Sequence, residues 1–314
     1  MFAIRQYELG PASTLLFEEV PDPTPGPGQV RLTVAAAGVH LVDTTIRKGA
    51  FGPVDLPMTP GREVAGVVTS TGPEVSSEWL GRRVVVHLGM ASGGYAELAV
   101  AAVESLHPLP DDVSFEAAVA MIGTGRTVVG VLGTAGLTAD DVVLVTSAAG
   151  GMGALFVQEA RNVGARVIGL ASGAKLDHVV GNGADAAIDY TRAGWSDGLK
   201  DITVVLDGVG GEVGTAALGT LGVGGRAIIY GWASGKATDT SVDNLYPKSL
   251  TATVALGPGL MRRGLRTLEE ESMAGLASGR FVPLINPPFA LRDAAKAHEA
   301  LESRATVGKV VLKP

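Results

Sequence analysis

A glycine-rich segment is the part of the sequence most able to do chemistry. The apolar run 141–146 predicts a strand, and residues 153–163 predict a helix after the segment Ser-Ala-Ala-Gly-Gly-Met. Ala148, Gly150 and Gly153 occupy the three positions of a GxGxxG fingerprint, with Ala in the first. Glycine at the second position lets the backbone approach a pyrophosphate, and the helix N-terminus offers free N–H groups to it. The segment therefore predicts a dinucleotide site, with a purely structural turn as the alternative.

The residues after the next predicted strand indicate which dinucleotide binds. A fold that binds NAD places Asp or Glu about 20 residues after the glycine turn, where it holds the ribose 2′-hydroxyl. Here the strand 166–170 is followed by Ser172 and Lys175, with no acid before Asp177. Lys175 could neutralise a 2′-phosphate that a carboxylate would repel. We expect NADPH rather than NADH, the alternative being that Lys175 is only a solvated lysine.

Two residue patterns along the chain predict the elements that must position these residues. Residues 1–110 consist of short Val-rich runs separated by turn clusters, which is typical of β structure. Ser114 is a good N-cap for a helix that we expect to be interrupted around 123–125. From 141 to 255 apolar runs alternate with helical patterns, which predicts a doubly wound parallel sheet buried on both faces. A helix at 291–303 and a strand at 308–312 follow.

Composition excludes several classes of protein. The chain has 314 residues, 44 Gly, no Cys and a net charge of −7. Without cysteine there is no disulfide and no thiolate metal site. The acidic balance disfavours nucleic acid as a partner, because binding of the phosphate backbone needs a basic face. The sequence shows no secretory signal and no run of 18 uncharged apolar residues, so we expect a cytoplasmic protein with no membrane partner.

These motifs, in this order and spacing, are similar to one protein family. The chain resembles the zinc-independent medium-chain dehydrogenase/reductases, in the NADPH:quinone oxidoreductase (zeta-crystallin-like) branch. Besides the turn at 148–153, the resemblance is carried along almost the whole chain by the segments Ala36–Gly49, Pro60–Val68, Gly183–Tyr190, Leu206–Gly211 and Gly308–Leu312.

The resemblance implies an architecture and an assembly. A GroES-like β catalytic domain would span residues 1–118, a Rossmann NADPH-binding domain 119–257, and a return to the catalytic domain 258–314. Members of the family are commonly homodimers or tetramers joined through the edge of the Rossmann sheet, where the strand 250–255 would lie. We therefore expect a homodimer.

The resemblance also assigns residues to the cofactor by position. Thr127 matches the threonine on the nicotinamide side and is a candidate catalytic residue. The other positions belong to the phosphate turn, the adenosine-phosphate pocket and the loops after later strands: Gly150, Gly151, Met152, Ser172, Lys175, Tyr190, Val209 and Gly231. For Tyr190, packing at the rim of the sheet is the alternative.

The position of His40 bears on the reaction. Zinc-dependent relatives place Cys at the position of His40 and His at the position of Arg62, so this chain offers no obvious set of three zinc ligands. Hydride transfer to a quinone or an α,β-unsaturated carbonyl needs no metal, because the negative charge moves to an oxygen that a hydrogen-bond donor can stabilise. We expect His40 to be that donor or a proton donor, the alternative being a packed polar residue, and Asp43 to orient its surroundings rather than act as a base.

Three functions stay open at this point. The leading hypothesis is an NADPH-dependent, zinc-independent reductase of a small apolar quinone or enone. An enoyl-thioester reductase is the second, and a non-catalytic NADPH-binding sensor or crystallin-like protein is the third. Thr45, Phe51 and Val129 stand where the quinone-reductase pattern usually has tyrosines, which predicts a more apolar acceptor pocket.

Overall fold

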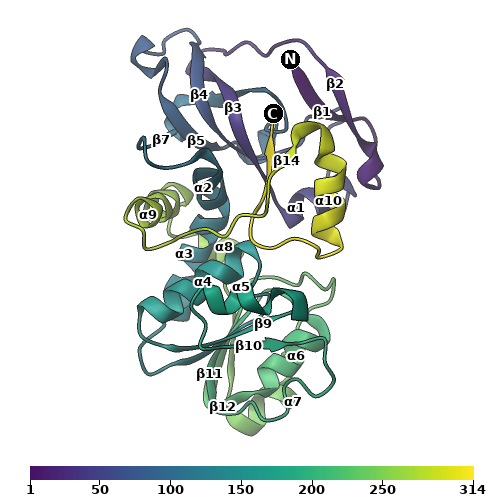
Figure 1. Cartoon of the computed structure of the whole chain (residues 1–314), viewed down its shortest axis with the longest axis vertical. Helices are drawn as coiled ribbons and strands as arrows, with labels where there is room; N and C mark the ends of the chain where they lie inside the picture. The colour runs from purple at the N-terminus through teal and green to yellow at the C-terminus, as the bar shows by residue number, and fades with distance from the viewer. The chain divides into compact units, whose positions relative to one another are not determined.

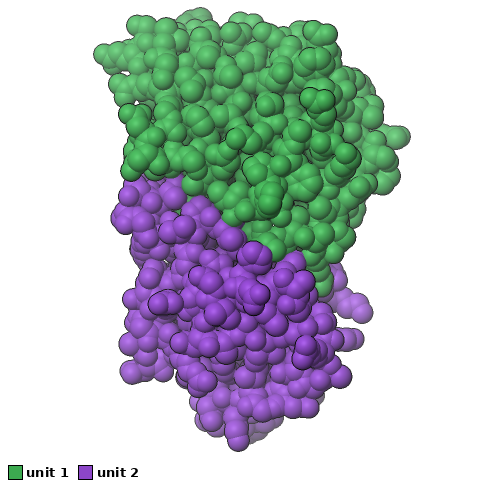
Figure 2. Space-filling view, in the orientation of Figure 1, with its two compact units in different colours: residues 1–123, 285–314 green, residues 124–284 purple.

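The computed structural model describes residues 1–314, and the chain divides into two compact units. Unit 1 contains residues 1–123 and 285–314, and unit 2 contains residues 124–284 (Figure 2). These boundaries differ from the predicted 118/119 and 257/258. Unit 2 extends past residue 257 to 284 because α8 (Pro258–Met261) and α9 (Leu265–Ala277) pack on α3 (Arg126–Ala135). Arg126 of α3 forms a 2.5 Å ion pair with Glu269 of α9.

Unit 1 is built on two sheets, in which all strand pairings but one are antiparallel. The strands β1 (Phe2–Gln6) and β2 (Leu15–Glu19) form a hairpin sheet. The larger sheet has the order β14-β15-β3-β4-β5-β7, with β6 also paired to β3. Its strands are β3 (Gln29–Val39), β4 (Glu63–Thr71), β5 (Arg83–His87), β6 (Leu98–Ala102), β7 (His107–Pro108), β14 (Phe289–Ala290) and β15 (Val310–Lys313).

Three helices complete unit 1. They are α1 (Leu41–Arg47), α2 (Phe115–Ala120) and α10 (Ala294–Glu302), and α10 packs against α1 and β15 (Figure 1). The hydroxyl of Ser114 accepts a hydrogen bond from Ala117 N, so Ser114 is the predicted N-cap of α2. The expected interruption after α2 is a π-helical turn, Met121–Gly125, through which the helix continues into α3.

Unit 2 is a six-stranded parallel sheet with helices packed against it (Figure 1). In the strand order β10-β9-β8-β11-β12-β13, β9 and β10 lie on one side of β8, and β11, β12 and β13 lie on the other. This change of side between β8 and β11 is the switch point of a Rossmann fold, which confirms the predicted fold class. The strands are β8 (Val142–Val145), β9 (Arg166–Ala171), β10 (Ala186–Asp189), β11 (Ile202–Asp207), β12 (Leu221–Ile229) and β13 (Thr251–Val254). The remaining helices are α4 (Gly151–Asn162), α5 (Leu176–Gly181), α6 (Gly211–Gly219) and α7 (Val242–Leu245).

One continuous helical run, residues 115–135, is long and apolar enough to cross a membrane by length and composition alone. Of its most apolar window, 67% is buried inside the structure, as in the core helix of a soluble protein. The run also contains Arg126, which is paired with Glu269. This feature is therefore weak evidence for a membrane span.

Candidate functional site

The predicted dinucleotide residues gather along one edge of the unit 2 sheet. All six strands are parallel, so their carboxyl ends lie at the same edge. Ligands of open parallel sheets bind at this edge, where the strand order reverses. The loops at the ends of β8, β9, β10, β11 and β12 carry Gly150, Gly151, Met152, Ser172, Tyr190, Val209 and Gly231.

The turn between β8 and α4 is shaped as an anion cradle. A Cβ on Gly153 would overlap the carbonyl oxygen of Ser147, so glycine is required for α4 to start this close to β8. Gly150 N donates to Ser147 O at 2.9 Å, and Ser147 itself has a positive φ of 54°. The first turn of α4 then presents the N–H groups of Gly151 and Met152 with no acceptor from the chain. These unsatisfied donors at a helix N-terminus favour a bound phosphate.

The buried carboxylate of Asp207 accepts hydrogen bonds from the loops at the same edge of the sheet. Its Oδ1 accepts hydrogen bonds from Thr146 Oγ1 at 2.9 Å and from Val209 N at 2.9 Å, and Thr238 Oγ1 donates to Oδ2. Thr146 Oγ1 also accepts from Gly208 N at 3.0 Å. One buried carboxylate thus fixes the loops after β8 and β11, which include the predicted contact residue Val209.

The region predicted to hold a 2′-phosphate contains one acid that the sequence spacing did not reveal. Ser172 and Lys175 frame a short helical turn, where Lys175 N donates to Ser172 O at 2.8 Å. A Cβ on Gly173, between them, would lie 2.8 Å from Asp189 Oδ2. Hydrogen bonds from Thr191 hold the pKa of Asp189 below its usual range, so this carboxylate is charged beside the turn. Asp189 comes from the end of β10, and only the parallel pairing of β9 with β10 brings it here.

Two further predicted residues have different surroundings. Tyr190 is partly buried and packs against the hydrophobic core of unit 2, and its N donates to Ala171 O at 3.2 Å. Thr127 lies in the first turn of α3, directly after the π-helical turn, and so apart in sequence from the strand ends. Their contacts with a cofactor stay predictions.

A buried polar cluster occupies unit 1. Glu63 begins β4, Lys309 precedes β15, and His40 follows β3, which lies between those two strands. Lys309 Nζ lies 2.8 Å from Glu63 Oε2 and 2.7 Å from His40 Nε2. His40 Nε2 lies 2.5 Å from Glu63 Oε2. Glu63 and Lys309 are buried, whereas 18% of the His40 side chain is exposed, so the cluster reaches solvent through His40.

Two glycines leave the space that this cluster needs. A Cβ on Gly38 would overlap Glu63 Oε2 and would lie 3.1 Å from Lys309 Cε. A Cβ on Gly123 would overlap Glu63 Oε1, which is buried without a hydrogen-bond partner. Because Gly38 has no side chain, Lys309 and Glu63 can meet across β3.

The cluster shifts the ionisation of both buried groups. Burial alone would raise the pKa of Glu63, but its close contacts with His40 and Lys309 outweigh burial and hold the pKa of Glu63 well below its usual range. Burial lowers the pKa of the Lys309 ammonium, against the opposing effect of Glu63. A lysine with a lowered pKa releases its proton more readily than an exposed lysine.

Asp43 holds the start of α1, and with it the backbone at His40. Asp43 Oδ2 accepts from His40 N at 2.8 Å, which is one half of a capping box. The same oxygen accepts from Tyr95 Oη at 3.1 Å, and Arg62 Nε lies 3.5 Å from Asp43 Oδ1. Asp43 therefore orients its neighbours, as expected from the sequence.

A chain of buried groups continues behind Asp43. Arg47 Nη1 lies 3.1 Å from His298 Nδ1, and His298 Nε2 lies 3.2 Å from Tyr95 Oη. A guanidinium only donates, so Nδ1 accepts and the ring proton is on Nε2, which donates to Tyr95. Burial lowers the pKa of His298 to about 4, so the ring is neutral at neutral pH. Sequence spacing could not reveal this chain, because its members come from α1, the loop before β6, and α10.

The structure brings no three His, Asp or Glu side chains together as a metal-binding group. Between His40 and Glu63, the two residues of this cluster that could ligate a metal, the cation present is the Lys309 ammonium. The positive charge of the cluster is therefore supplied by the chain itself.

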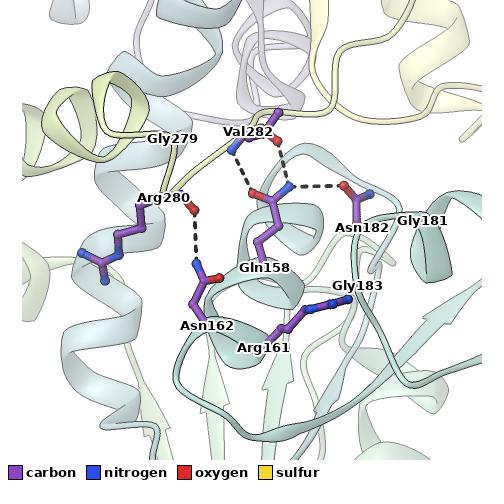
Figure 3. A pocket seen from close by; sticks show the side chains of 9 residues that line it. All are labelled: Gln158, Arg161, Asn162, Gly181, Asn182, Gly183, Gly279, Arg280 and Val282. Atoms are coloured by element: carbon purple, nitrogen blue, oxygen red, sulfur yellow. Dashed lines mark hydrogen bonds between the residues drawn. The ribbon is translucent and has the colours of Figure 1, made fainter.

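A separate pocket of about 340 Å³ lies in unit 2 (Figure 3). Gln158 spans it, donating to Val282 O at 2.8 Å and to Asn182 Oδ1 at 3.2 Å, and Val282 N donates back to Gln158 Oε1. Figure 3 shows these polar groups turned toward one another rather than toward open space. The pocket contains none of the predicted cofactor residues.

Two family descriptions match separate segments of the chain. Residues 26–111 match the alcohol dehydrogenase GroES-like domain, and residues 182–312 match a domain described as zinc-binding dehydrogenase. The unit 1 match confirms the expected GroES-like domain.

Whole-chain comparison finds relatives that share the full length. A quinone oxidoreductase of Sus scrofa is 34% identical over 323 residues, covering 99% of this chain and 97% of the relative. A solved quinone oxidoreductase of Escherichia coli complexed with NADPH is 31% identical, with a TM-score of 0.87 and full coverage of both chains. A solved mycobacterial protein complexed with NADPH is 32% identical, also with a TM-score of 0.87 and full coverage of both chains.

The neutral His298 should make the protein less stable in mild acid. The pKa of His298 falls from 6.5 to about 4 on folding, so below about pH 6.5 the unfolded chain binds a proton that the folded chain does not. The free energy of unfolding should fall by up to about 1.4 kcal/mol for each pH unit between about 6.5 and 5.5, a range above most of the titration of unfolded carboxylates. Urea unfolding at a series of pH values measures this slope.

The matched variants are His298→Gln and His178→Gln, since His178 is exposed on α5. His298→Gln should flatten the slope, whereas His178→Gln should keep it. An unchanged slope in His298→Gln would show that His298 titrates normally.

Proposed function

Because the chain belongs to the quinone oxidoreductase family of medium-chain dehydrogenase/reductases, we propose that it reduces a quinone or an α,β-unsaturated carbonyl with NADPH, without zinc. The observation that carries this proposal is the cluster of His40, Glu63 and Lys309, which supplies a proton donor and a fixed positive charge. An electron-poor acceptor needs a donor at its oxygen rather than a metal.

The residues at the carboxyl edge of unit 2 fit NADPH. Gly150, Gly151 and Met152 would hold the pyrophosphate on the free N–H groups of α4. Ser172 and Lys175 would hold the 2′-phosphate, with Lys175 offsetting the nearby charge of Asp189. Thr127, Tyr190, Val209 and Gly231 complete the proposed contacts. When bound, NADPH supplies the hydride.

His40 is the proposed proton donor. Its Nε2 faces Lys309 and Glu63, and the ring also caps the N–H of Asp43, so a ligand reaches Nδ1 by replacing that backbone group, which keeps its hydrogen bond to His40 O. Nε2 lies within hydrogen-bonding distance of a donor, the Lys309 ammonium, and of an acceptor, the Glu63 carboxylate. One imidazole nitrogen cannot accept and donate at once, so the two contacts correspond to two positions of the ring proton.

These two positions define a proton relay. At the start of the reaction, with the acceptor oxygen in place of Asp43 N, His40 carries its proton on Nδ1 and accepts at Nε2 from Lys309. After hydride transfer the acceptor oxygen is negative, and it takes the Nδ1 proton. Nε2 then takes a proton from Lys309, leaving a neutral amine and a ring whose Nε2–H donates to Glu63. Water returns the proton to Lys309 through the exposed edge of His40, so charge and protons balance.

The cluster also supports a reaction without zinc. A metal between His40 and Glu63 would have to displace the Lys309 ammonium, which lies 2.8 Å from Glu63 Oε2 and is buried. Two ligands are also fewer than the three protein ligands of catalytic zinc sites.

The outer strand of unit 2 supports a homodimer. β13 ends the sheet and pairs only with β12, where Ala255 N donates to Ile229 O at 2.8 Å. Because N–H directions alternate along a strand, those of Ala252 and Val254 point away from β12 and stay unpaired. The Val254 side chain is 64% exposed on this edge. A second copy of β13 would satisfy these groups.

The reaction is tested by following NADPH oxidation with 1,4-benzoquinone, 9,10-phenanthrenequinone, cyclohexenone and crotonyl-CoA, before and after dialysis against a chelator. We expect turnover of a quinone or cyclohexenone that survives the chelator. A clear preference for crotonyl-CoA would instead favour an enoyl-thioester reductase. NADPH binding without oxidation by any acceptor would favour a non-catalytic binding protein.

The relay is tested in the same assay with Lys309→Arg and His40→Gln. Arginine keeps the positive charge beside Glu63 but does not release a proton, so kcat should fall by about tenfold or more. His40→Gln should lower kcat at least as much, and both variants should keep the NADPH Kd. Lys296→Met, which removes an exposed lysine of α10, is the control. Wild-type kcat in Lys309→Arg would contradict the relay.

Cofactor preference is tested by calorimetry with NADPH and NADH. Lys175→Ala should weaken NADPH about tenfold, the loss of one charge-assisted contact, and should leave NADH unchanged. Lys200→Ala, an exposed lysine of the same unit, should change neither. Equal binding of NADH and NADPH by the wild type would contradict the 2′-phosphate assignment.

The dimer is tested by analytical ultracentrifugation. The wild type should sediment with about twice the 31.9 kDa of one chain. Val254→Lys places like charges at the proposed interface between the two β13 strands and should weaken association at least about tenfold. Val180→Lys, the same change at a 52% exposed valine of α5, should not. A monomeric wild type, or an intact Val254→Lys dimer, would contradict this interface.

A further inference from the structure

Arg62 carries a guanidinium to which the chain offers no oxygen acceptor within hydrogen-bonding range. Its Nε is buried without a hydrogen-bond partner, and the nearest carboxylate oxygen, Asp43 Oδ1, is 3.5 Å away. The other recorded contact is from Nη1 to the thioether of Met90 at 4.0 Å, a weak acceptor. Asp43 thus balances part of the charge, but the buried Nε–H has no hydrogen-bond partner, and Nη1 has only the thioether.

Arg47 and Arg83, two other arginines of unit 1, differ from Arg62 in this respect, whereas the partly buried Arg31 also has an unpartnered Nε. Arg47 donates to Gly10 O at 3.1 Å and to Glu302 Oε1 at 2.7 Å. Arg83 donates to Pro110 O at 2.6 Å and also to Val113 O. Buried donors are normally satisfied in this way. Arg62 differs from Arg31 in lying next to Asp43 and Glu63, beside the His40 cluster, so its missing oxygen points to an acceptor from outside the chain.

Arg62 is placed to meet a molecule that also reaches His40. Asp43 touches both residues, accepting from His40 N at 2.8 Å and lying 3.5 Å from Arg62 Nε. Only 14% of the Arg62 side chain is exposed, but its neighbour Met90 is 68% exposed. The guanidinium therefore lies just beneath the surface, under one flexible side chain.

We propose that Arg62 binds a carboxylate of the acceptor, so that the preferred substrate is a small acidic enone or quinone. This inference rests on the reductase function proposed above. The planar fork of a guanidinium matches a carboxylate with two parallel hydrogen bonds. Lys309, the other cation of the site, is already engaged by Glu63. Since the whole chain has a net charge of −7, a bound acid needs such a local cation.

The test compares trans-6-oxo-4-heptenoate with its methyl ester, in which two methylenes separate the carboxyl group from the enone, so that the two share one enone and differ in one charge. In the wild type, kcat/KM for the acid should exceed that for the ester by about tenfold or more, the worth of a charged hydrogen-bonded contact. Arg62→Gln should abolish this ratio, and Arg62→Lys should restore only part of it, because a lysine lacks the fork. Arg292→Gln, an exposed arginine of unit 1, should keep the wild-type ratio.

A binding measurement separates this inference from the reductase function. Calorimetry with 4-oxopentanoate and its methyl ester, which lack the reducible double bond, reports the carboxylate site without turnover. The acid should bind the wild type at least about tenfold more tightly than the ester, and Arg62→Gln should remove the difference. Equal binding of acid and ester would overturn the inference even if enones are reduced. Weaker NADPH binding by Arg62→Gln would also overturn it, since Arg62 would then hold a cofactor phosphate.

Discussion

The buried ion pair between Lys309 and Glu63 is the interaction on which the unit 1 site depends. Removing two charges from water costs several kcal/mol for each ion, and only close geometry with further hydrogen bonds offsets this cost. The 2.8 Å contact across Gly38 and the neighbouring His40 provide that geometry. Loss of one partner would leave an uncompensated buried charge, a destabilisation of about 3–5 kcal/mol. The pair therefore constrains the sequence at Gly38 and Gly123 as well as at its own positions.

The same pair explains why the chain returns to unit 1 at its end. Lys309 lies beside β3 only because β15 pairs with β3, with Val311 opposite Gly38. Residues 285–314 thus deliver one partner, and β4 delivers the other. His40 lies where both meet solvent, and Asp43, Tyr95 and His298 hold the backbone that carries it. Binding of the dinucleotide is left to the separate edge of the unit 2 sheet.

The parts of the fold that sequence predicts are those set by local pattern. The parallel sheet of unit 2 follows from short apolar runs that alternate with helices. The turn at 147–153 is recognisable because it needs glycine at 153, where a Cβ would overlap the backbone of Ser147. By contrast, α1 has only seven residues and no distinct apolar stripe, so its pattern is too short to recognise. The boundary near 284 is set by packing of α9 on α3, which no local signal records.

The candidate site is predictable only where its residues are close in sequence. Glu63 and Lys309 lie within the motifs 60–68 and 308–312, but nothing in either motif indicates that the two side chains meet. The spacing of an acid about 20 residues after the glycine turn does not predict Asp189, because strand pairing, not sequence distance, places it beside Gly173. Arg62 is visible as a departure from the zinc-dependent pattern, yet only the structure shows that its N–H groups lack an oxygen acceptor.

The central claim is that Lys309 and Glu63 set the proton position on His40. Nitrogen-15 NMR of the histidine-labelled protein, with His40→Gln for assignment, measures the protonation of each ring nitrogen directly. In the complex with 4-oxopentanoate, the account predicts that His40 carries its proton on Nδ1 and accepts at Nε2, and that Lys309→Arg keeps this tautomer while its kcat falls. A proton on Nε2 and a bare Nδ1 in that complex would contradict the account, because no proton would then face the acceptor.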